Sequence, residues 1–507
     1  MATGKSLGMK GTLQQFILGF AAMFCAASAS AESYVWQGEY SGTWAEPTNW
    51  SPNGTPGAGD TAVFSYSVEI TDGFAIGSGT LTLNVEADVE LSLKGVISGS
   101  GAIAKTGRGA ISLYGANTFS GGFTAGETSG ASTTMAYHGS TYAVNASGGL
   151  VGVWHGSGLG TGAVMVNTPL YVAGGITVTT PITKGWRSGM LIIRGEGDVA
   201  FDATFTTTAN LPINGPSQDS TLRFKKPFVA TVSGCWISHS GGYGINLVFE
   251  DEFAGDGSYP CSTSLANGNA DFYGLTNGFS TLEIHKTTRF HQPNSFTASV
   301  LAFKKSDGWL DLCGCDQTLT NCTITQESGI SDYGVSSDSP AQLKLTGQSK
   351  IGYEAVNPNF RGLFSGCAGL YFSRSGGYGI ILDGSVQKTR GKFSFGGNAY
   401  LKLVNGASFK NLGELELLSS NGKIDLSNAT SGDVYVDKVT FESAWTYFVG
   451  GVGKIYCRSL FAGSTQKEDG TYVKENGKFP ALDETGEGGI VVNSHMWDPK
   501  GFIVSFM

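Results

Sequence analysis

Residues 95–126 alternate with a period of two, and this pattern constrains the fold more than any other feature of the chain. Every second residue from Ile97 to Asn117 is apolar or small, apart from Lys105 and the final asparagine. Successive side chains of a β-strand point to opposite faces, so the pattern predicts strands with one buried face. The glycines suit corners at which the backbone takes a positive φ. Lys105 falls in the inward series, and we expect its ammonium to reach solvent at a corner.

Glycine is abundant, with 76 of 507 residues, whereas the chain has only 14 prolines. Charged residues make up 14% of the chain, compared with about 25% in an average protein. Low charge with frequent glycine, serine, threonine and valine is typical of strands joined by tight turns. Beyond the first 31 residues no stretch has a sustained helical period, so we expect an all-β protein.

Similar segments return along the chain. The sequence SGCWISHSGGYGINL from Ser233 resembles SGCAGLYFSRSGGYGIIL from Ser365. Short alternating stretches, separated by turns rich in glycine, serine or asparagine, fill the chain between them. A strand cannot bury its apolar face alone, but strands stacked by coiling can, and their backbone groups then pair between turns. The sequence therefore predicts one continuous parallel β-helix, a β-solenoid with about 23 residues per rung.

The first 31 residues have the pattern of a secretory signal peptide. Lys5 and Lys10 form a basic start, the apolar stretch FILGFAAMFC begins at Phe16, and small residues precede Glu32. This pattern predicts cleavage between Ala31 and Glu32. The rest of the sequence has no apolar run long enough for a transmembrane helix. We therefore expect an exported mature chain without a transmembrane segment, either secreted or held at the cell surface.

The charge of the chain limits its partners. The formal net charge is −9, and it becomes −11 once Lys5 and Lys10 leave with the signal segment. Lysine and arginine form no cluster in the remaining sequence. A mildly acidic chain without a basic patch is poorly suited to nucleic acid and to anionic membranes. We predict no nucleic-acid partner.

The segment GVISGSGAIAKTGRGAISLYGANTFSGGFTAG, residues 95–126, resembles the autotransporter-associated β-strand repeat. It shares the repeat's alternating glycines, its Ile, Lys and Leu positions, and the ending Asn-Thr-Phe-Ser-Gly-Gly. The segment GLGTGAVMVNTPLYVAGG from Gly158 is similar to the one that usually follows. The stretch WQGEYSGTWAEPTNWSPNGTPGAGDTAVFS from Trp36 is similar to the first turn of many exported bacterial proteins with this repeat. The resemblance implies a right-handed, single-stranded parallel β-helix.

These features divide the chain into four parts. We expect a signal peptide at 1–31, an N-terminal cap with the first rungs at 32–80, the β-helix at 81–450, and closing rungs with a charged hairpin at 451–507. Between about 170 and 440 the repeat pattern is degenerate, and only the periodicity supports the assignment. The sequence after Val492 leaves no room for the membrane barrel of an autotransporter, so the resemblance implies the passenger-type fold without it.

The ends of a solenoid expose strand edges that promote aggregation. Trp36, Trp44 and Trp50 lie in the first mature rungs and are well placed to cover one end, although exposed tryptophans could instead stack on sugars. The segment Lys467–Glu487 holds nine charges in 21 residues, and charges on an edge deter pairing. We expect both features to protect the ends.

An enzyme must be considered, because parallel β-helices are common among polysaccharide lyases and hydrolases. Hydrolysis needs two converging carboxylates, and a lyase needs a base. The candidate acids are Asp307, Asp311 and Asp316 in one segment and Glu250, Asp251, Glu252 and Asp256 in another, and the candidate bases are Lys304 and Lys305. Acids in turns are usually solvated, so we predict no catalytic residue.

Cysteine and histidine give no clear metal pattern. Seven cysteines remain after the signal segment, namely Cys235, Cys261, Cys313, Cys315, Cys322, Cys367 and Cys457. We expect mostly buried thiols. Cys313, Cys315 and Cys322 supply three thiols without an evident fourth ligand for zinc. Cys235 and Cys261 are 26 residues apart, about one rung, and could form a disulfide if they stack. The six histidines, at positions 138, 155, 239, 285, 291 and 495, lack metal-ligand spacing.

Two functions fit these features. We favour an exported, non-catalytic structural or adhesive β-helix of the bacterial surface or exterior, with surface glycans or polysaccharides as possible partners. The alternative is a secreted carbohydrate-active β-helix enzyme, either a lyase or a glycoside hydrolase. We predict no cofactor, because the glycine-rich GSGLGTG from Gly156 lies among strands and does not open a helix.

Overall fold

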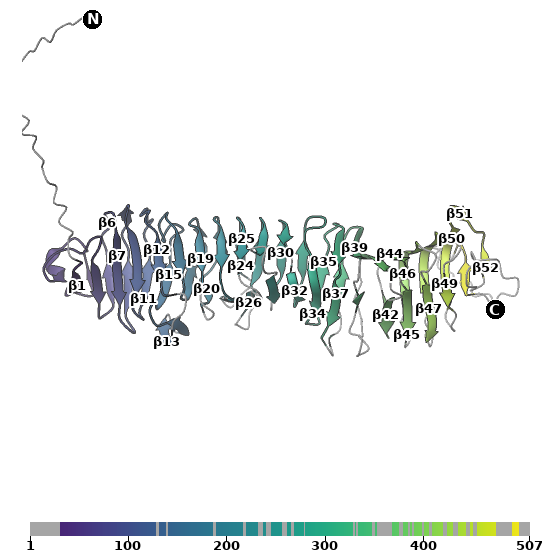
Figure 1. The fold of residues 1–507 in the computed structure, drawn as a ribbon, viewed down its shortest axis with the longest axis horizontal. Coiled ribbons are helices and arrows are strands. Elements are labelled where there is room, and N and C mark those ends of the chain that lie inside the picture. The colour runs from purple at the N-terminus through teal and green to yellow at the C-terminus, as the bar shows by residue number, and fades with distance from the viewer. Residues whose placement is uncertain are drawn as a thin grey trace, which may run out of the picture.

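The chain winds into a single elongated rod, with strands that follow one another from the N-terminal to the C-terminal end (Figure 1). The computed structural model describes residues 31–495, and its one helical element there is the 3-10 turn η1 (Pro47–Asn49). Gaps in this description fall at 128–130, 138–139, 186–188, 216–219, 232–236, 240–244, 256–260, 265–267, 278, 328–329, 331–332, 347–349, 352–367, 375–378, 384–385, 388–389, 398–399, 405–407, 419–422, 429–433, 443–446, 450–453 and 473–488.

Four sheets, A, B, C and E, form the N-terminal part of the rod. Sheet A contains, in spatial order, β3 (Trp50–Ser51), β1 (Ser33–Trp36), β4 (Thr61–Phe64), β7 (Thr80–Val85), β10 (Ala102–Thr106), β12 (Phe123–Ala125), β16 (Val164–Val166), β19 (Ile182–Lys184), β22 (Phe205–Thr207), β25 (Phe228–Ala230), β28 (Phe253–Gly255) and β31 (Thr276–Asn277). Sheet B contains β2 (Ser41–Gly42), β5 (Val68–Ile70), β8 (Glu90–Leu93), β11 (Ala110–Leu113), β15 (Leu150–Val153), β17 (Leu170–Ala173), β20 (Leu191–Arg194), β23 (Leu211–Asn214) and β26 (Ile237–His239). The short sheet C pairs β6 (Phe74–Ile76) with β9 (Ile97–Gly99). Sheet E contains β18 (Thr177–Val178), β21 (Val199–Phe201), β24 (Thr221–Phe224), β27 (Asn246–Phe249), β30 (Ala270–Phe272), β33 (Thr288–Phe290), β35 (Trp309–Asp311) and β38 (Gly334–Ser336).

The C-terminal part is built from three further sheets. Sheet F contains β29 (Cys261–Ser264), β32 (Phe279–Ile284), β34 (Ala298–Phe303), β37 (Thr323–Gln326) and β40 (Lys350–Ile351). Sheet G contains β36 (Gln317–Thr320), β39 (Ala341–Thr346), β41 (Ala368–Arg374), β44 (Lys392–Gly397), β46 (Ser408–Leu417), β48 (Val434–Phe441), β50 (Ile455–Ala462), β53 (Ile490–Val492) and β52 (Gly470–Tyr472), with β43 (Val386–Gln387) and β51 (Thr465–Gln466) at its margin. Sheet H contains β42 (Gly379–Asp383), β45 (Tyr400–Val404), β47 (Lys423–Asn428) and β49 (Tyr447–Val449).

The winding is that of a parallel β-helix, which confirms the predicted fold class. The chain passes through β22, β23 and β24 on sheets A, B and E in turn, and then returns to sheet A with β25. Phe205, Phe228, Phe253 and Thr276 are successive parallel Cα partners, so these rungs take 23 to 25 residues. The rung length agrees with the spacing expected from the sequence.

One longer rung carries an insertion on the outside of the rod. The step from Phe123 to its partner Val164 includes the antiparallel hairpin of β13 (Ser132–Tyr137) and β14 (Ser140–Asn145). Met135 and Val144 of this hairpin are buried in a small cluster with four residues on strands of sheet B, namely Ala110, Leu150, Tyr171 and Ile192. The hairpin therefore covers part of the outer face of sheet B.

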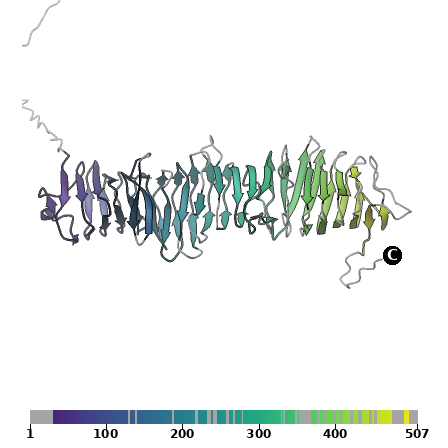
Figure 2. The same cartoon turned by 90° about the horizontal axis from the view of Figure 1, so that it is seen from below.

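The cross-section of the rod changes along its length. Most rungs before about residue 351 pass through three sheets, whereas from β44 to β49 the chain alternates between sheets G and H alone. The rod is continuous through this change, as the view from below shows (Figure 2). Strands lengthen at the same point, from two to four residues in sheet E to ten in β46 and eight in β48. Longer strands on fewer faces keep the rung length nearly constant, since Phe393 and Leu415 are still Cα partners.

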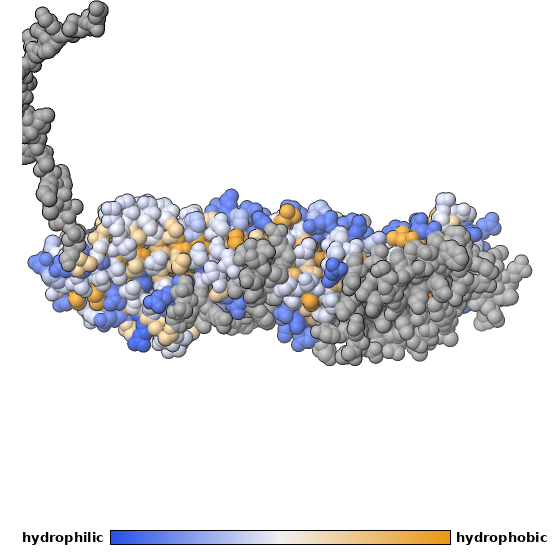
Figure 3. Space-filling model, viewed as in Figure 1, coloured by the Kyte–Doolittle hydropathy of each residue, from blue (hydrophilic) through white to orange (hydrophobic). Residues whose placement is uncertain are grey.

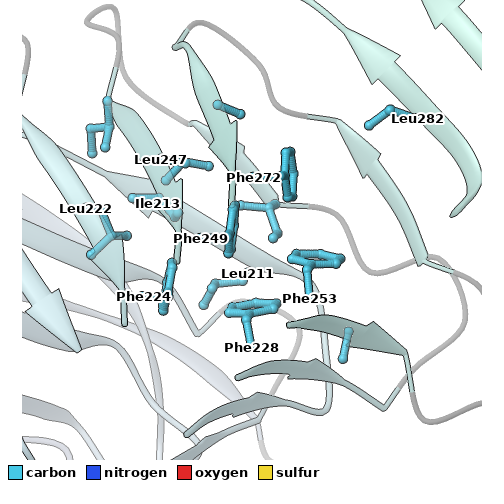
Figure 4. Close-up of a cluster of buried hydrophobic side chains, with 14 of the residues drawn as sticks. Leu211, Ile213, Leu222, Phe224, Phe228, Leu247, Phe249, Phe253, Phe272 and Leu282 are labelled. Carbon is cyan, nitrogen blue, oxygen red and sulfur yellow. The ribbon is translucent and has the colours of Figure 1, made fainter. Parts of the chain in front are cut away.

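The inward side chains form one continuous apolar core, as the period of two predicts. Ile97, Ile103, Ile111 and Leu113 are fully buried. Farther along, phenylalanines stack from rung to rung in two columns, and Phe249 lies parallel to Phe224 and Phe272 with ring centroids 5.2 and 4.9 Å away (Figure 4). Stacked rings of neighbouring rungs bury large apolar areas in close contact.

Lys105 is buried, and the expectation that its ammonium reaches solvent is wrong. Its side chain is 1% exposed, and Nζ donates to the carbonyl oxygens of Thr106, Gly107 and Gly109 at 2.9, 2.9 and 2.8 Å. The three N–H bonds of an ammonium are thus matched by three acceptors at the corner after β10. Gly107 has φ +77°, and a Cβ there would lie 2.1 Å from the Val85 carbonyl oxygen, so the corner requires glycine. Burial lowers the pKa of Lys105 to about 7.

The three N-terminal tryptophans belong to the core. Trp36, Trp44 and Trp50 are 0%, 2% and 2% exposed, and the ring of Trp50 packs edge-on against both others. Each indole N–H donates to a backbone carbonyl oxygen, at 3.1, 3.2 and 3.0 Å. These rings cover the first rungs and are not available to stack on a sugar. Most of the charged segment Lys467–Glu487 lies outside the described residues.

Candidate functional site

The outer face of sheet E brings charged side chains together on consecutive rungs. Asp271, Arg289 and Asp311 are parallel Cα partners on β30, β33 and β35. The guanidinium of Arg289 lies between the two carboxylates, with Nη1 3.5 Å from Asp271 Oδ2 and Nε 3.6 Å from Asp311 Oδ2. Asp311 Oδ1 also accepts the backbone N–H of Cys313 at 2.9 Å. These three residues are far apart in the sequence, and the register of the sheet brings them together.

Two rings adjoin these charges. Tyr273 and His291 follow β30 and β33, and their rings stack with centroids 4.0 Å apart and an interplanar angle of 2°. His291 Nε2 lies 2.9 Å from Asp271 Oδ1, and the amide of Gln292 donates to the Tyr273 carbonyl oxygen. Tyr273 is nevertheless 44% exposed. We call Asp271, Tyr273, Arg289, His291 and Asp311 the Arg289 cluster.

Ion pairs between neighbouring rungs continue along the outer face of sheet E toward its N-terminal end. Arg223 Nη1 lies 2.8 Å from Glu250 Oε1, and Lys225 Nζ lies 4.0 Å from Asp202 Oδ2. Glu250 was one of the candidate acids, and it is therefore engaged by a cation. Asp251 Oδ1 accepts the backbone N–H of Glu252 within the following turn, while Asp256 lies outside the described residues.

The other candidate acids are held in separate places. Asp307 is exposed and pairs with Lys286 at 3.0 Å. Asp316 is also exposed, and its Oδ1 accepts the backbone N–H of Gln342 at 2.8 Å. Of the three acids in this segment, only Asp311 joins the Arg289 cluster.

The candidate bases do not join the cluster. Lys304 Nζ lies 3.6 Å from Glu283 Oε1 and 3.9 Å from Glu327 Oε2, on the side of sheet F. Lys305 is exposed in the turn that follows β34. His285 Nε2 lies 3.3 Å from Glu283 Oε2, so a histidine and a lysine share this carboxylate.

The described cysteines do not converge. Cys322 and Cys457 are buried in the core, and burial raises the pKa of each thiol to about 12. Cys313 and Cys315 are partly exposed, and burial, aided by Asp311, raises the pKa of Cys313 to about 12. Cys235 and Cys367 lie outside the described residues, as does the proposed contact of Cys235 with Cys261.

No metal-binding arrangement of three or more His, Cys, Asp or Glu side chains occurs in the described part of the chain. His155 Nδ1 lies 3.1 Å from Ser157 Oγ in an exposed turn, and His495 is exposed near the C-terminal end. The sequence GSGLGTG forms the turn between β15 and β16, where Gly160 has φ +77°.

A second charged group lies on sheet G, where every carboxylate oxygen already has a donor. Lys392 Nζ lies 2.6 Å from Glu416 Oε1 and 3.5 Å from Glu414 Oε2. Lys438 Nζ contacts Glu414 Oε1 at 2.9 Å, which Thr440 also reaches, and Ser394 donates to Glu416 Oε2. Burial alone would raise the pKa of Glu414, but the hydrogen bond from Lys438 and the charge of Lys392 lower it. This saturated network stabilises the sheet and offers little to a ligand.

Sequence analysis singled out only Asp311 of the Arg289 cluster. The other members lie in the stretches ADFYG and TRFHQ, where polar residues flank an inward phenylalanine, Phe272 or Phe290. Asp311 and Cys313 flank Leu312 in the same way. Aligning such stretches at the rung spacing is the signal that could have found the cluster.

On the face of the rod shown in Figure 3, hydrophilic patches alternate with pale areas and with some hydrophobic ones. Within the described residues no helix has the length and apolar character needed to span a membrane. Fold and site define the chain as a parallel β-helix protein with an outward-facing polar and aromatic cluster. Comparison of the chain with family models, curated proteins and solved structures gave no match.

Proposed function

We propose that the mature protein is an exported, non-catalytic structural or adhesive rod that binds surface glycans or polysaccharides through the outer face of sheet E. The position of Arg289 carries the proposal. Asp271 and Asp311 are two rungs apart, about 10 Å on the spacing of a sheet, and the guanidinium occupies the space between them. Such an arrangement presents fixed hydrogen-bonding groups along an extended surface, as solenoids do when they bind through many contacts.

The alternative, a secreted polysaccharide lyase or glycoside hydrolase, fits this geometry less well. A hydrolase needs its two carboxyl groups to face each other across the scissile bond or an attacking water. In the Arg289 cluster a cation fills that gap, and the candidates Asp307 and Lys304 are engaged with different partners. The geometry therefore favours binding over bond cleavage.

The start of the described chain supports export. Ala31 and Glu32 are exposed, and the first strand begins just after them, at Ser33. Cleavage between them would leave β1 and every later rung intact. The new α-amino group of Glu32 would lie next to Asp60, whose Oδ1 is 3.1 Å from the Glu32 nitrogen.

Expression of the full chain in a bacterium with a general secretory pathway tests export. We expect the protein outside the cytoplasm with Glu32 as its first residue, as determined by mass spectrometry of the N-terminal peptide. An Ala31→Phe variant should keep its leader, because signal peptidases require a small residue before the cleaved bond. Cytoplasmic protein that still begins with the leader would contradict the proposal.

A further inference from the structure

We infer that the Arg289 cluster is a binding site for neutral glycans and that it discriminates against acidic ones. The inference rests on the proposed function and names the class of ligand for the same face. Three features carry it: an exposed aromatic platform, a guanidinium with unused donors, and the formal charge of the cluster.

Tyr273 is an exposed aromatic ring that is held in place. Stacking on His291 fixes one of its faces, and the Gln292 amide fixes its backbone carbonyl. His291 is itself oriented by Asp271 at 2.9 Å. Tyr273 loses little conformational freedom on binding, since its position is set beforehand. The exposed part of the ring provides apolar area against which the C–H face of a sugar can pack.

Arg289 supplies directed hydrogen-bond donors beside this ring. A guanidinium has five N–H donors in a rigid plane. The contacts of Arg289 with described residues involve Nη1 and Nε at 3.5 and 3.6 Å, which leaves the two N–H groups of Nη2 for a ligand. The carboxylates of Asp271 and Asp311 hold the guanidinium from both sides and can themselves accept hydroxyl hydrogens. Such pairs of donors and acceptors match the hydroxyl groups of a sugar ring.

The charge of the cluster selects among sugars. Asp271, Asp311 and Arg289 together carry a formal charge of −1, and the whole chain carries −9. A uronic acid or sulfated sugar would have to approach two carboxylates, and like charges in proximity oppose binding. A neutral sugar meets no such repulsion. We therefore expect neutral polymers to bind and acidic ones to be rejected.

Affinity electrophoresis of the mature protein in gels that contain a neutral β-glucan, a neutral mannan or polygalacturonate tests the inference. We expect retardation by at least one of the neutral polymers and none by polygalacturonate. Tyr273→Ala and Arg289→Gln should each weaken the affinity about tenfold or more, a loss equivalent to roughly 1.4 kcal/mol. Both side chains point outward, so circular dichroism should show unchanged strand content.

Matched controls use the same residue types elsewhere. Tyr40 is 77% exposed near the N-terminal end, and Arg458 on sheet G lies 3.9 Å from Asp437, away from sheet E. Tyr40→Ala and Arg458→Gln should bind like the wild type. Preference for polygalacturonate, failure to bind either neutral polymer, or full affinity in Tyr273→Ala would overturn the inference. If Tyr273→Ala keeps full affinity, binding of the protein to the polymer would still agree with the proposed function, and only the assignment of the site would be wrong. Cleavage of the polymer would instead contradict the proposed function.

Discussion

Replacement of Phe249 by alanine is expected to lower the free energy of unfolding by about 3–5 kcal/mol, the usual cost of removing a buried phenylalanine. Phe249 is 1% exposed and contacts four other phenylalanines, two stacked and two edge-on. Its removal opens a cavity in the middle of the column, where rungs on both sides hold the backbone in place. Urea denaturation followed by far-ultraviolet circular dichroism measures the loss.

Phe249→Leu is the matched control, because leucine keeps most of the apolar volume and should cost less than half as much. Each rung contacts only its neighbours, so the damage should be local. Limited proteolysis should then cut Phe249→Ala preferentially between sheet E strands β24 and β30. A Phe249→Ala variant within about 1 kcal/mol of the wild type would contradict the stacked core.

Lys105→Met is expected to cost on the order of 3 kcal/mol, although methionine is apolar and of similar length. The substitution leaves the carbonyl oxygens of Thr106, Gly107 and Gly109 without the donor that now serves all three. Lys94→Met provides the control. Lys94 is partly exposed, 3.5 Å from Glu69 and above the ring of Tyr114, and its replacement should cost about 1 kcal/mol or less.

The stability difference between the wild type and Lys105→Met should also depend on pH. Burial lowers the pKa of Lys105 from 10.5 in the unfolded chain to about 7 in the folded protein. Between these values the unfolded chain binds more protons, so the wild type gains stability as the pH rises. Burial also lowers the pKa of Lys184, which donates to the Gly185 carbonyl oxygen, to about 7. The stability difference between the wild type and Lys184→Met should therefore rise with pH in the same way. A difference that stays flat or falls between pH 7 and 10 would contradict this account.

The sequence sufficed for the fold because alternation is a local property. The inward series from Ile97 to Asn117 is buried except at two glycines, Gly99 and Gly107, and the expected rung length of about 23 residues agrees with the register. Lys105 shows where local reasoning failed. The period of two placed it inside, but a lysine is rarely buried, and the carbonyl oxygens that receive it become visible only once the corner is built.

The candidate site could be predicted only in part, because it depends on register between distant rungs. Asp311 stood out in its segment, yet its partner Arg289 comes from the preceding rung and Asp271 from the one before. Insertions such as the β13–β14 hairpin and the change from three faces to two alter the count of residues between rungs. A search by sequence spacing alone therefore cannot pair these residues.

The most direct test of the function is the fate of a polysaccharide that the mature protein binds. After prolonged incubation, the chain length of the polymer is measured by size-exclusion chromatography with light scattering, and new reducing or unsaturated ends are assayed. We expect retention of the protein on the polymer, unchanged chain length and no new ends. Shortening of the polymer that Asp311→Asn or Asp307→Asn abolishes would contradict the account and identify the protein as an enzyme.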